Sequence, residues 1–318
     1  MVKTLLRKLL GAGVVLLCAT FLLFVLIRVA PGDPIQLLLG RSAEVAMSDT
    51  TAYDRKAAEL RAEFGLDRSV AAQYIAWSKR LLRLDLGESI RTGRPVGAEI
   101  AERLPATAFL AVSGLAIQAL LGLIFGTIAA LKANFVQDNA IRLACVGLAS
   151  TPVFVIGLGL LSVCAVTLGI YEISSEAVLS RLWLPALTLG AMGAPQLIRV
   201  VRANLLSELG RTYVLSALSR GLDRRTVVRH ALRNALLPVV TLAALSLTMS
   251  ISGAVVIESI FSWPGIGKYA LDSLLIQDYP VIQGYALVMI ALVILIHLLA
   301  EIAYALVDPR VRRKGGAG

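Results

Sequence analysis

Six long apolar runs constrain this chain more than any other feature of its sequence. They cover residues 9–29, 106–131, 141–170, 183–201, 235–260 and 284–307. Each run reaches the roughly 20 residues that an α-helix needs to cross the hydrocarbon core of a bilayer. The composition agrees, because 57% of the residues are hydrophobic and only 16% are charged. We therefore expect an all-α, polytopic membrane protein with six transmembrane helices.

The first run allows two interpretations. Lys3, Arg7 and Lys8 precede it, and a basic start followed by an apolar run also describes a cleaved signal peptide. This run, however, ends at Arg28 and the sequence PGDP, without a small-x-small cleavage pattern. We expect residues 1–30 to form a retained transmembrane helix.

The distribution of charge predicts the orientation. Three basic residues lie before the first run, four lie in the tail, and eight arginines lie between residues 199 and 233. Six spans place all three segments on one side, and Lys and Arg accumulate on the cytoplasmic side of membranes. We predict that both termini and the loop 204–234 are cytoplasmic. Residues 31–104 carry eleven basic and eleven acidic residues and are expected outside.

These boundaries divide the chain into four regions. Residues 1–30 form the first helix, residues 31–104 the extracytoplasmic segment, residues 105–308 a five-helix core and residues 309–318 a basic tail. Short amphipathic helices are expected in the outer segment, with Lys79 and Arg80 turned outward. Their apolar stripe is predicted from residues that recur at steps of three and four: Tyr74, Trp77, Leu81 and Leu84.

Few side chains suggest catalysis or metal binding. His297 and Glu301 stand four residues apart in the last run, so a metal or proton site and a structural hydrogen bond both stay open. Glu258 either lines a path or pairs with an arginine or the backbone. The cysteines Cys18, Cys145 and Cys164 lie in apolar runs without paired spacing, which disfavours a disulfide or zinc site. We expect no catalytic, metal or cofactor site in this chain.

Two glycine motifs have structural interpretations. The sequence SWPGIGKYA lacks the phosphate-loop pattern, since Ser262 stands where Gly is needed and Tyr269 where Ser or Thr is needed. We expect a tight re-entrant turn there, shaped by Pro264, Gly265 and Gly267. Gly122 and Gly126 form a GxxxG motif, which favours close helix packing either within the chain or with a partner.

The basic stretch RTYVLSALSRGLDRRTVVRHALRNALLP, residues 211–238, is predicted to form two helices joined by a turn. Residues 205–220 form the first helix, Gly221 ends it in the left-handed conformation, and Asp223 caps a second helix over residues 224–236. Since membrane spans anchor both ends, a DNA-binding role is disfavoured. Lipid contact explains the arginines. Lipid contact does not explain why the apolar residues Val214, Ala217 and Leu218 recur at helical spacing. An apolar helix face of this kind suits a groove on a protein partner.

The order of these residues resembles the permeases of ABC importers of the dipeptide, oligopeptide and nickel class. The loop carries Tyr213-Val214, Arg220-Gly221-Leu222 and RHALRNA at residues 229–235. Further matching motifs are PGDP, FGLD, LDLGESIRTGRPV, LPAT, VVIESIFSWPGIGKYA, QDYPVIQ and DPR. The broader family has Glu-Ala-Ala where this chain has Leu215, Ser216 and Ala217, and Leu-Pro at Arg233-Asn234.

This resemblance implies a fold and a mechanism. The fold would be the type I importer permease (MetI-like) architecture, in the bacterial cytoplasmic (inner) membrane. A second homologous permease, two cytoplasmic ATPase subunits and an extracytoplasmic binding protein would be its partners, with ATP and Mg²⁺ bound by the ATPases. The substrate would be a dipeptide, an oligopeptide, glutathione, nickel or a metal chelate. The ATPase-contacting residues would be Tyr213, Ala217, Arg220, Gly221, Leu222 and Asp223, supported by Arg229, His230, Arg233, Asn234 and Pro238.

Two other classes of function are less consistent with the sequence. A secondary transporter usually has inverted repeats and carboxylates at the bilayer midplane. A membrane-embedded enzyme needs a constellation of catalytic side chains. Neither pattern is clear in this chain. Uptake that survives loss of the ATPase subunits would eliminate the importer.

The predicted orientation can be tested with a single cysteine, Ser219→Cys. Because the loop 204–234 is expected in the cytoplasm, only reagents that cross the membrane should label this cysteine in intact cells. Labelling by a membrane-impermeant reagent would overturn the orientation.

Overall fold

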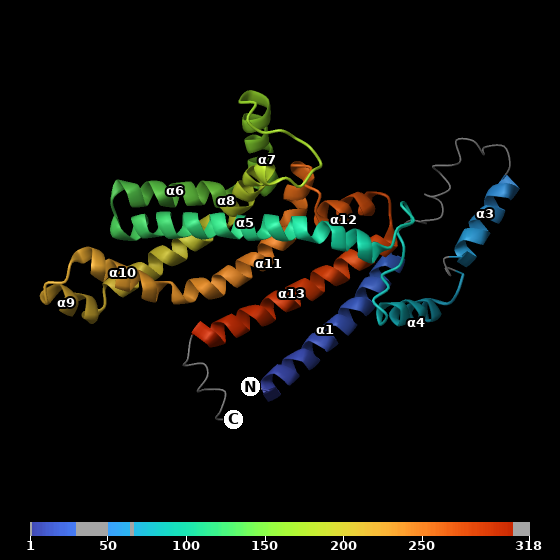
Figure 1. Ribbon diagram of the computed structural model, residues 1–318, viewed down its shortest axis with the longest axis horizontal. Coiled ribbons are helices and arrows are strands. Elements are labelled where there is room, and N and C mark those ends of the chain that lie inside the picture. Colours follow the sequence, from blue (N-terminus) through green and yellow to red (C-terminus); the bar gives the residue numbers. More distant parts are fainter. Residues whose placement is uncertain (1, 30–49, 64–66, 308–318) are drawn as a thin grey trace. The chain divides into compact units, whose positions relative to one another are not determined.

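The computed structural model describes residues 2–29, 50–63 and 67–307, and the regular structure within these ranges is helical, as predicted (Figure 1). The elements are α1 (Val2–Val29), α3 (Thr50–Glu63), α4 (Val70–Leu81), α5 (Val96–Leu131), α6 (Val136–Ser150), α7 (Val153–Leu161), the π-helix η2 (Ser162–Thr167), α8 (Leu179–Leu209), α9 (Thr212–Ser219), α10 (Arg224–Ala235), α11 (Leu237–Ile260), α12 (Ile266–Leu275) and α13 (Tyr279–Val307).

Three described helices are long and apolar enough to cross a membrane. They are Val96–Leu131, Leu179–Leu209 and Tyr279–Ala300, and the bent pair α6 and α7–η2 makes a fourth if it is one span. Leu10–Leu26 and Leu245–Ile260 are shorter apolar helices. Each of the six apolar runs thus contains apolar helix, and the count of six crossings stays a prediction.

The third run is not one continuous helix. The two parts, Val136–Ser150 and Val153–Thr167, are bent by 101°. Pro152 has no backbone N–H to continue the helix, and it favours an extended conformation in the residue before it. Thr151 accordingly has φ −93° and ψ 126°. The hydrophobic run was visible in the sequence, but this proline divides it.

The chain forms two compact units. The first comprises Met1–Leu104 with Tyr269–Ile294, and the second comprises Pro105–Lys268 with Leu295–Gly318. In the first unit, Phe24, Trp77 and Leu287 form a buried cluster that includes Tyr74, Leu81 and Leu86 at its edge. The rings of Phe24 and Tyr74 meet edge to face with 5.3 Å between centroids.

The predicted apolar stripe of α4 is therefore correct for Tyr74, Trp77 and Leu81, and wrong for Leu84. Helix α4 ends at Leu81, so the helical spacing no longer applies three residues later. Leu84 has a φ of 59° and is 87% exposed. Lys79 and Arg80 are exposed, as predicted.

Two motifs that are far apart in the sequence meet in the first unit. The carboxylate of Asp278, in QDYPVIQ, accepts a hydrogen bond of 2.6 Å from the hydroxyl of Ser89, in LDLGESIRTGRPV. It also accepts from the backbone N–H groups of Ile90 and Arg91. Since Asp278 and Ser89 are buried, this carboxylate holds the 89–91 segment in place.

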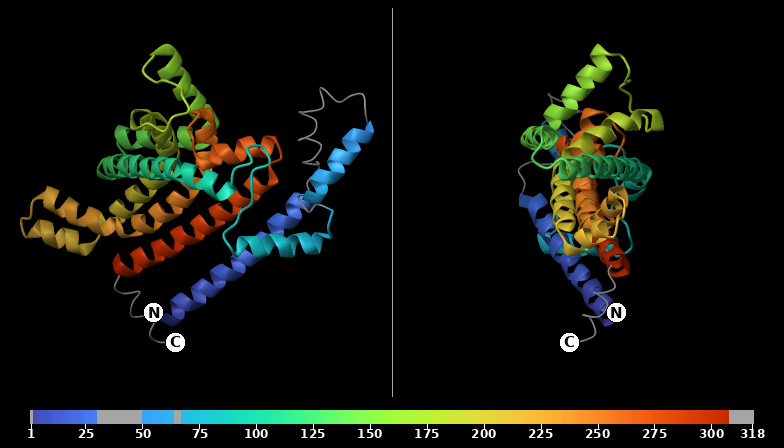
Figure 2. Two further views of the ribbon diagram at one scale, coloured as in Figure 1. Left: turned by 45° about the vertical axis from the view of Figure 1, so that its right-hand side comes forward. Right: turned by 90° about the vertical axis from the view of Figure 1, so that its left-hand side faces the viewer.

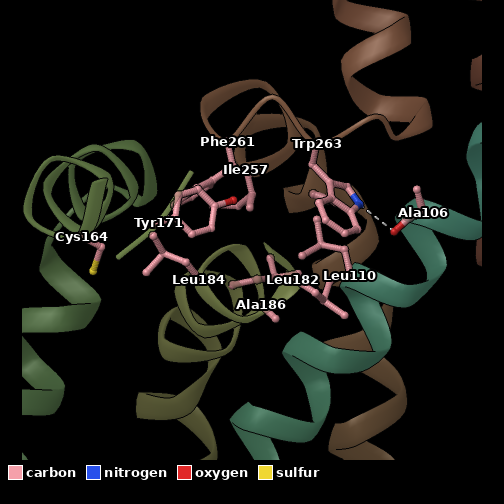
Figure 3. Close-up of a cluster of buried hydrophobic side chains, with 12 residues drawn as sticks. Ala106, Leu110, Cys164, Tyr171, Leu182, Leu184, Ala186, Ile257, Phe261 and Trp263 are labelled. Carbon is pink, nitrogen blue, oxygen red and sulfur yellow. Dashed lines mark hydrogen bonds between the residues drawn. The ribbon is translucent and has the colours of Figure 1, made fainter. Parts of the chain in front are cut away.

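The core of the second unit gathers side chains from α5, η2, α8, α11 and the turn after α11 (Figure 3). Phe261 and Ile257 are fully buried. The ring of Tyr171 packs edge-on against Phe261, with 5.8 Å between centroids. The indole N–H of Trp263 donates a hydrogen bond of 2.9 Å to the carbonyl of Ala106. This bond satisfies the indole N–H within a mainly apolar cluster.

Helices α5 and α8 pack with little room for side chains between them. A methyl group added at Gly122 would lie 2.6 Å from Cγ of Leu197, and one added at Gly126 would lie 2.7 Å from Cβ of Val201. The GxxxG motif, for which two uses were open, therefore packs within the chain. On the facing helix, a methyl group at Gly190 would lie 2.7 Å from the carbonyl oxygen of Gly114.

We predict that Gly122→Ala destabilises the protein because Leu197 cannot move away without disturbing α8. The expected cost is about 1–3 kcal/mol, seen as a lower midpoint of thermal unfolding in detergent. Gly147→Ala is the control, since no atom lies within 4 Å of a methyl group there. Equal midpoints for the two variants would contradict this packing.

Candidate functional site: the α9–α10 helix pair

Helices α9 and α10 lie side by side at one end of α8 and α11 (Figure 2). The single helix expected over residues 205–220 is wrong, because α8 ends at Leu209 and α9 begins at Thr212. Gly210 follows the end of α8, and Arg211 is extended, with φ −77° and ψ 151°. Glycine is a poor helix former, and a two-residue connection therefore separates α9 from α8.

The turn between α9 and α10 has the predicted conformation. Gly221 has a φ of +77°. Its N–H donates to the carbonyl of Leu218, and the N–H of Leu222 donates to that of Ala217. These two bonds form a Schellman motif, which satisfies carbonyl groups at the end of α9. Asp223 caps α10, since its carboxylate accepts a hydrogen bond from the N–H of Arg225.

Helix α10 is fixed to α8 by small apolar side chains. Ala231 and Ala235 are buried together with Leu205 of α8 and Ala130 of α5. The opposite side of α10 and the adjoining turn expose basic side chains, namely Arg220, Arg224, Arg225, Arg229, His230 and Arg233. The helix pair thus has an apolar inner side and a basic outer side.

The outward apolar surface of α9 differs from the predicted register. Val214, predicted to belong to it, is buried. The exposed side chains are instead those of Leu215 and Leu218 on α9, at 63% and 43%, and of Leu222 just after Gly221, at 39%. We call these three side chains the leucine row. Ala217 is half-buried, so Leu218 alone of the predicted three is both apolar and well exposed.

The hydroxyl of Tyr213 and the side-chain amide of Asn234 meet between α9 and α10, and both side chains are also exposed to solvent. The hydroxyl of Tyr213 donates a hydrogen bond of 2.9 Å to Oε2 of Glu208 and accepts one of 3.4 Å from Nδ2 of Asn234. Burial raises the pKa of Tyr213 above its ordinary value. The three residues join α8, α9 and α10. In the sequence, Glu208 contributes only to the net charge of the loop, and nothing in the local pattern indicates that it binds Tyr213.

Some of the residues singled out in the sequence are only partly described. Pro238 lies in the first turn of α11, but its side chain is outside the described residues. The same holds for the side chain of Glu301, whereas His297 is exposed on α13. The pairing of His297 with Glu301 stays a prediction.

Glu258 pairs with the backbone, which was one of its two expected roles. Its carboxylate is fully buried and accepts hydrogen bonds from the Thr107 hydroxyl, at 2.6 Å, and from the N–H of Lys268, at 2.9 Å. The Thr107 oxygen in turn accepts from the N–H of Ile266. Glu258 and Thr107 thus cap the first turn of α12, and the predicted turn at Pro264–Gly267 brings these groups together.

Two family descriptions match the chain. Residues 122–313 match the family "Binding-protein-dependent transport system inner membrane component". Residues 1–111 match the N-terminal region of such membrane components. Together the two matches extend over most of both compact units.

Curated relatives match over almost their whole length. A Brucella ovis protein named as a peptide permease is 37% identical, over 96% of this chain and 97% of its own. The glutathione transport system permease protein of Pectobacterium atrosepticum is 35% identical, over 99% and 100%. The dipeptide transport system permease protein of Escherichia coli K12 is 32% identical, over 93% and 94%.

A solved structure has a similar fold. It is that of the MetNI methionine ABC transporter in an inward-facing conformation, with a TM-score of 0.52 and 15% sequence identity. The match covers 66% of this chain and 96% of the chain in that structure. The fold is therefore of the MetI-like permease type, as expected.

The capping of α12 can be tested with Thr107→Val. Valine has nearly the same shape but no hydroxyl, so the Glu258 carboxylate and the Ile266 N–H would lose a partner. We predict a loss of about 1–3 kcal/mol, measured as a lower thermal midpoint in detergent. Thr107→Ser keeps the hydroxyl and should lie close to the unaltered protein. If Thr107→Val is as stable as Thr107→Ser, these bonds contribute little.

Proposed function

Because this chain belongs to the family of binding-protein-dependent transport system inner membrane components, we propose that it imports peptides and binds an ATPase through α9. The chain is a non-catalytic permease subunit of an ABC importer. Its helices provide a path through the membrane, and ATP is hydrolysed by separate subunits of the transporter.

Peptides are the substrate class that the relatives favour. The names of the three relatives described above refer to peptides, glutathione and dipeptides. These molecules share a peptide backbone, so a path that accommodates the backbone and tolerates varied side chains would serve all of them. Nickel and metal chelates, expected as alternatives from the sequence, do not occur in those names.

The leucine row is the observation that carries the proposed ATPase contact. Leu215 and Leu218 are exposed on the short helix α9, and Leu222 is exposed directly after the turn at Gly221 that ends it. Full burial of a leucine side chain contributes about 1.5–3 kcal/mol. A groove on a partner that accepts α9 would remove this surface from water, and the surrounding arginines would face acidic groups at its rim.

The remaining parts of the proposal follow from such an importer. A second homologous permease would complete the path, two ATPases carrying ATP and Mg²⁺ would bind on the cytoplasmic side, and a binding protein would deliver the substrate from outside. Closure of the ATPases would move α9 and shift the membrane helices between inward- and outward-open states. Both termini of this chain would lie in the cytoplasm of a bacterial cell.

The double variant Leu215→Asp with Leu218→Asp tests the ATPase contact. Two carboxylates in place of leucines that the ATPase would bury should cost at least about 3 kcal/mol of binding free energy, which is more than 100-fold in affinity. We predict loss of the ATPases from the purified complex and loss of ATP-driven peptide uptake.

Ser216→Asp is the matched control, because it adds a charge to an exposed position of the same helix, about 100° around it from Leu215 and about 160° from Leu218. It should retain the ATPases. Normal recovery of the ATPases with the double variant would refute this contact. Uptake that a protonophore abolishes while ATP is normal would instead favour a secondary transporter.

A further inference from the structure

We propose that Glu208 is a positioning residue that locks α9 to α8, so that movement of α9 is passed to a membrane helix. This inference rests on the proposed ATPase contact at α9, and it adds the route by which that contact acts. The lock consists of Glu208, Tyr213, Arg211 and Asn234. Its effect is on coupling between ATP hydrolysis and transport, and not on ATP hydrolysis itself.

Both oxygens of the Glu208 carboxylate are engaged by the segment that follows α8. Oε2 accepts the hydrogen bond of 2.9 Å from the Tyr213 hydroxyl, and Oε1 lies 3.0 Å from Nε of Arg211. Glu208 itself is 8% exposed. A carboxylate near the C-terminus of a helix is opposed by the helix dipole, and burial adds a desolvation cost. The contacts with Arg211 and Tyr213 offset both costs, and the contact with Tyr213 is lost if α9 moves away from α8.

Helix α9 has few other attachments to its surroundings. Its connection to α8 consists of Gly210 and the extended Arg211, which allow rotation about several bonds. Val214 is its one buried side chain. Helix α10, by contrast, buries Val227, Ala231 and Ala235. The polar lock therefore decides whether α9 moves together with α8 or swings separately.

Asn234 extends the lock to α10. Its side-chain amide donates to the Tyr213 hydroxyl, and the amide of Asn204 on α8 donates to the carbonyl of Ala235 at the end of α10. Both bonds are 3.4 Å long. The single hydroxyl of Tyr213 thus joins three helices, and its removal breaks two hydrogen bonds at once.

A second ion pair on α8 carries the movement further. Arg202, six residues before Glu208, binds both oxygens of Asp138 on α6, at 2.7 and 2.6 Å. Asp138 is fully buried and also accepts a hydrogen bond from the N–H of Asn134. Arg202 and Glu208 together give a continuous route from α9 through α8 to α6. The close contact of α5 with α8 adds a third helix to the same body.

The lock predicts what happens when it is removed. The ATPases would still bind the leucine row and close on ATP, because neither step needs Glu208. Helix α9 would then swing about Gly210 and Arg211 without displacing α8. ATP would be hydrolysed, and fewer peptides would be transported for each ATP.

The experiment uses the complete transporter, with its ATPases and binding protein, in liposomes. Tyr213→Phe removes only the hydroxyl, which bonds Glu208 and Asn234, and keeps the ring that was expected to contact an ATPase. Glu208→Ala removes the carboxylate. For both variants we expect normal recovery of the ATPases, at least half of the normal ATP hydrolysis, and about five- to tenfold less peptide transported per ATP. The combination of both changes should lower this ratio no further than Glu208→Ala alone, because the two groups act as a pair.

Ser216→Ala is the matched control. It also removes one hydroxyl from α9, but that hydroxyl bonds only the carbonyl of Thr212 in the same helix. The transport ratio should be unchanged in this variant. Glu208→Gln keeps an acceptor for Tyr213 and loses the charge that faces Arg211, so it should lie between Glu208→Ala and the unaltered protein.

Two results would overturn the lock. A normal transport ratio in Tyr213→Phe and Glu208→Ala would show that α9 moves α8 without these groups. Parallel loss of hydrolysis, transport and bound ATPases in both variants would assign them to folding of α9 alone. If Glu208→Ala does not assemble with the ATPases, the amount of peptide that Tyr213→Phe transports per ATP tests the lock by itself. Failure of the proposed ATPase contact is recognised separately, by ATPases that bind Leu215→Asp with Leu218→Asp normally.

Discussion

The backbones of α5 and α8 approach so closely that a methyl group at Gly190 would press on the carbonyl oxygen of Gly114. In lipid, apolar side chains gain little by moving from the bilayer to a neighbouring helix, so van der Waals contact between close backbones supplies much of the attraction. Helix α8 is also in contact with α6, α7, α10 and α11. Glycines thus determine how α8 packs against α5, and the helices around α8 are positioned by their contacts with it.

Several polar groups in this apolar surrounding are satisfied by partners that are distant in the sequence. Glu258 of α11 and Thr107 of α5 together cap α12, and the carboxyamide of Gln118 on α5 donates to Ser246 on α11 and to the carbonyl of Gly193 on α8. An unpaired group of this kind would cost several kcal/mol in a medium without water. These bonds therefore specify which helices meet, while the apolar contacts determine how closely they meet.

Local chemistry made part of the fold and of the site predictable from the sequence. The left-handed conformation of Gly221 and the cap at Asp223 depend on one residue and its immediate neighbours, and both were correct. The break at Gly210 and the exposure of Leu84 depend on where a helix ends, which a periodic pattern alone cannot locate. The hydrogen bond from Tyr213 needed the position of Glu208 on another helix. Burial of Val214 likewise follows from packing, so the leucine row was only partly foreseen.

The fixed ends of α9 have a consequence for its register. The eight residues of this helix span about 12 Å, between the extended Arg211 and the left-handed Gly221. Each residue in an α-helix turns by about 100°, so one inserted residue would rotate one part of the leucine row away from the other. Deletion of one residue would do the same in the opposite sense. The count of residues between Arg211 and Gly221 thus matters as much as their type, because it determines the direction in which each part of the leucine row faces.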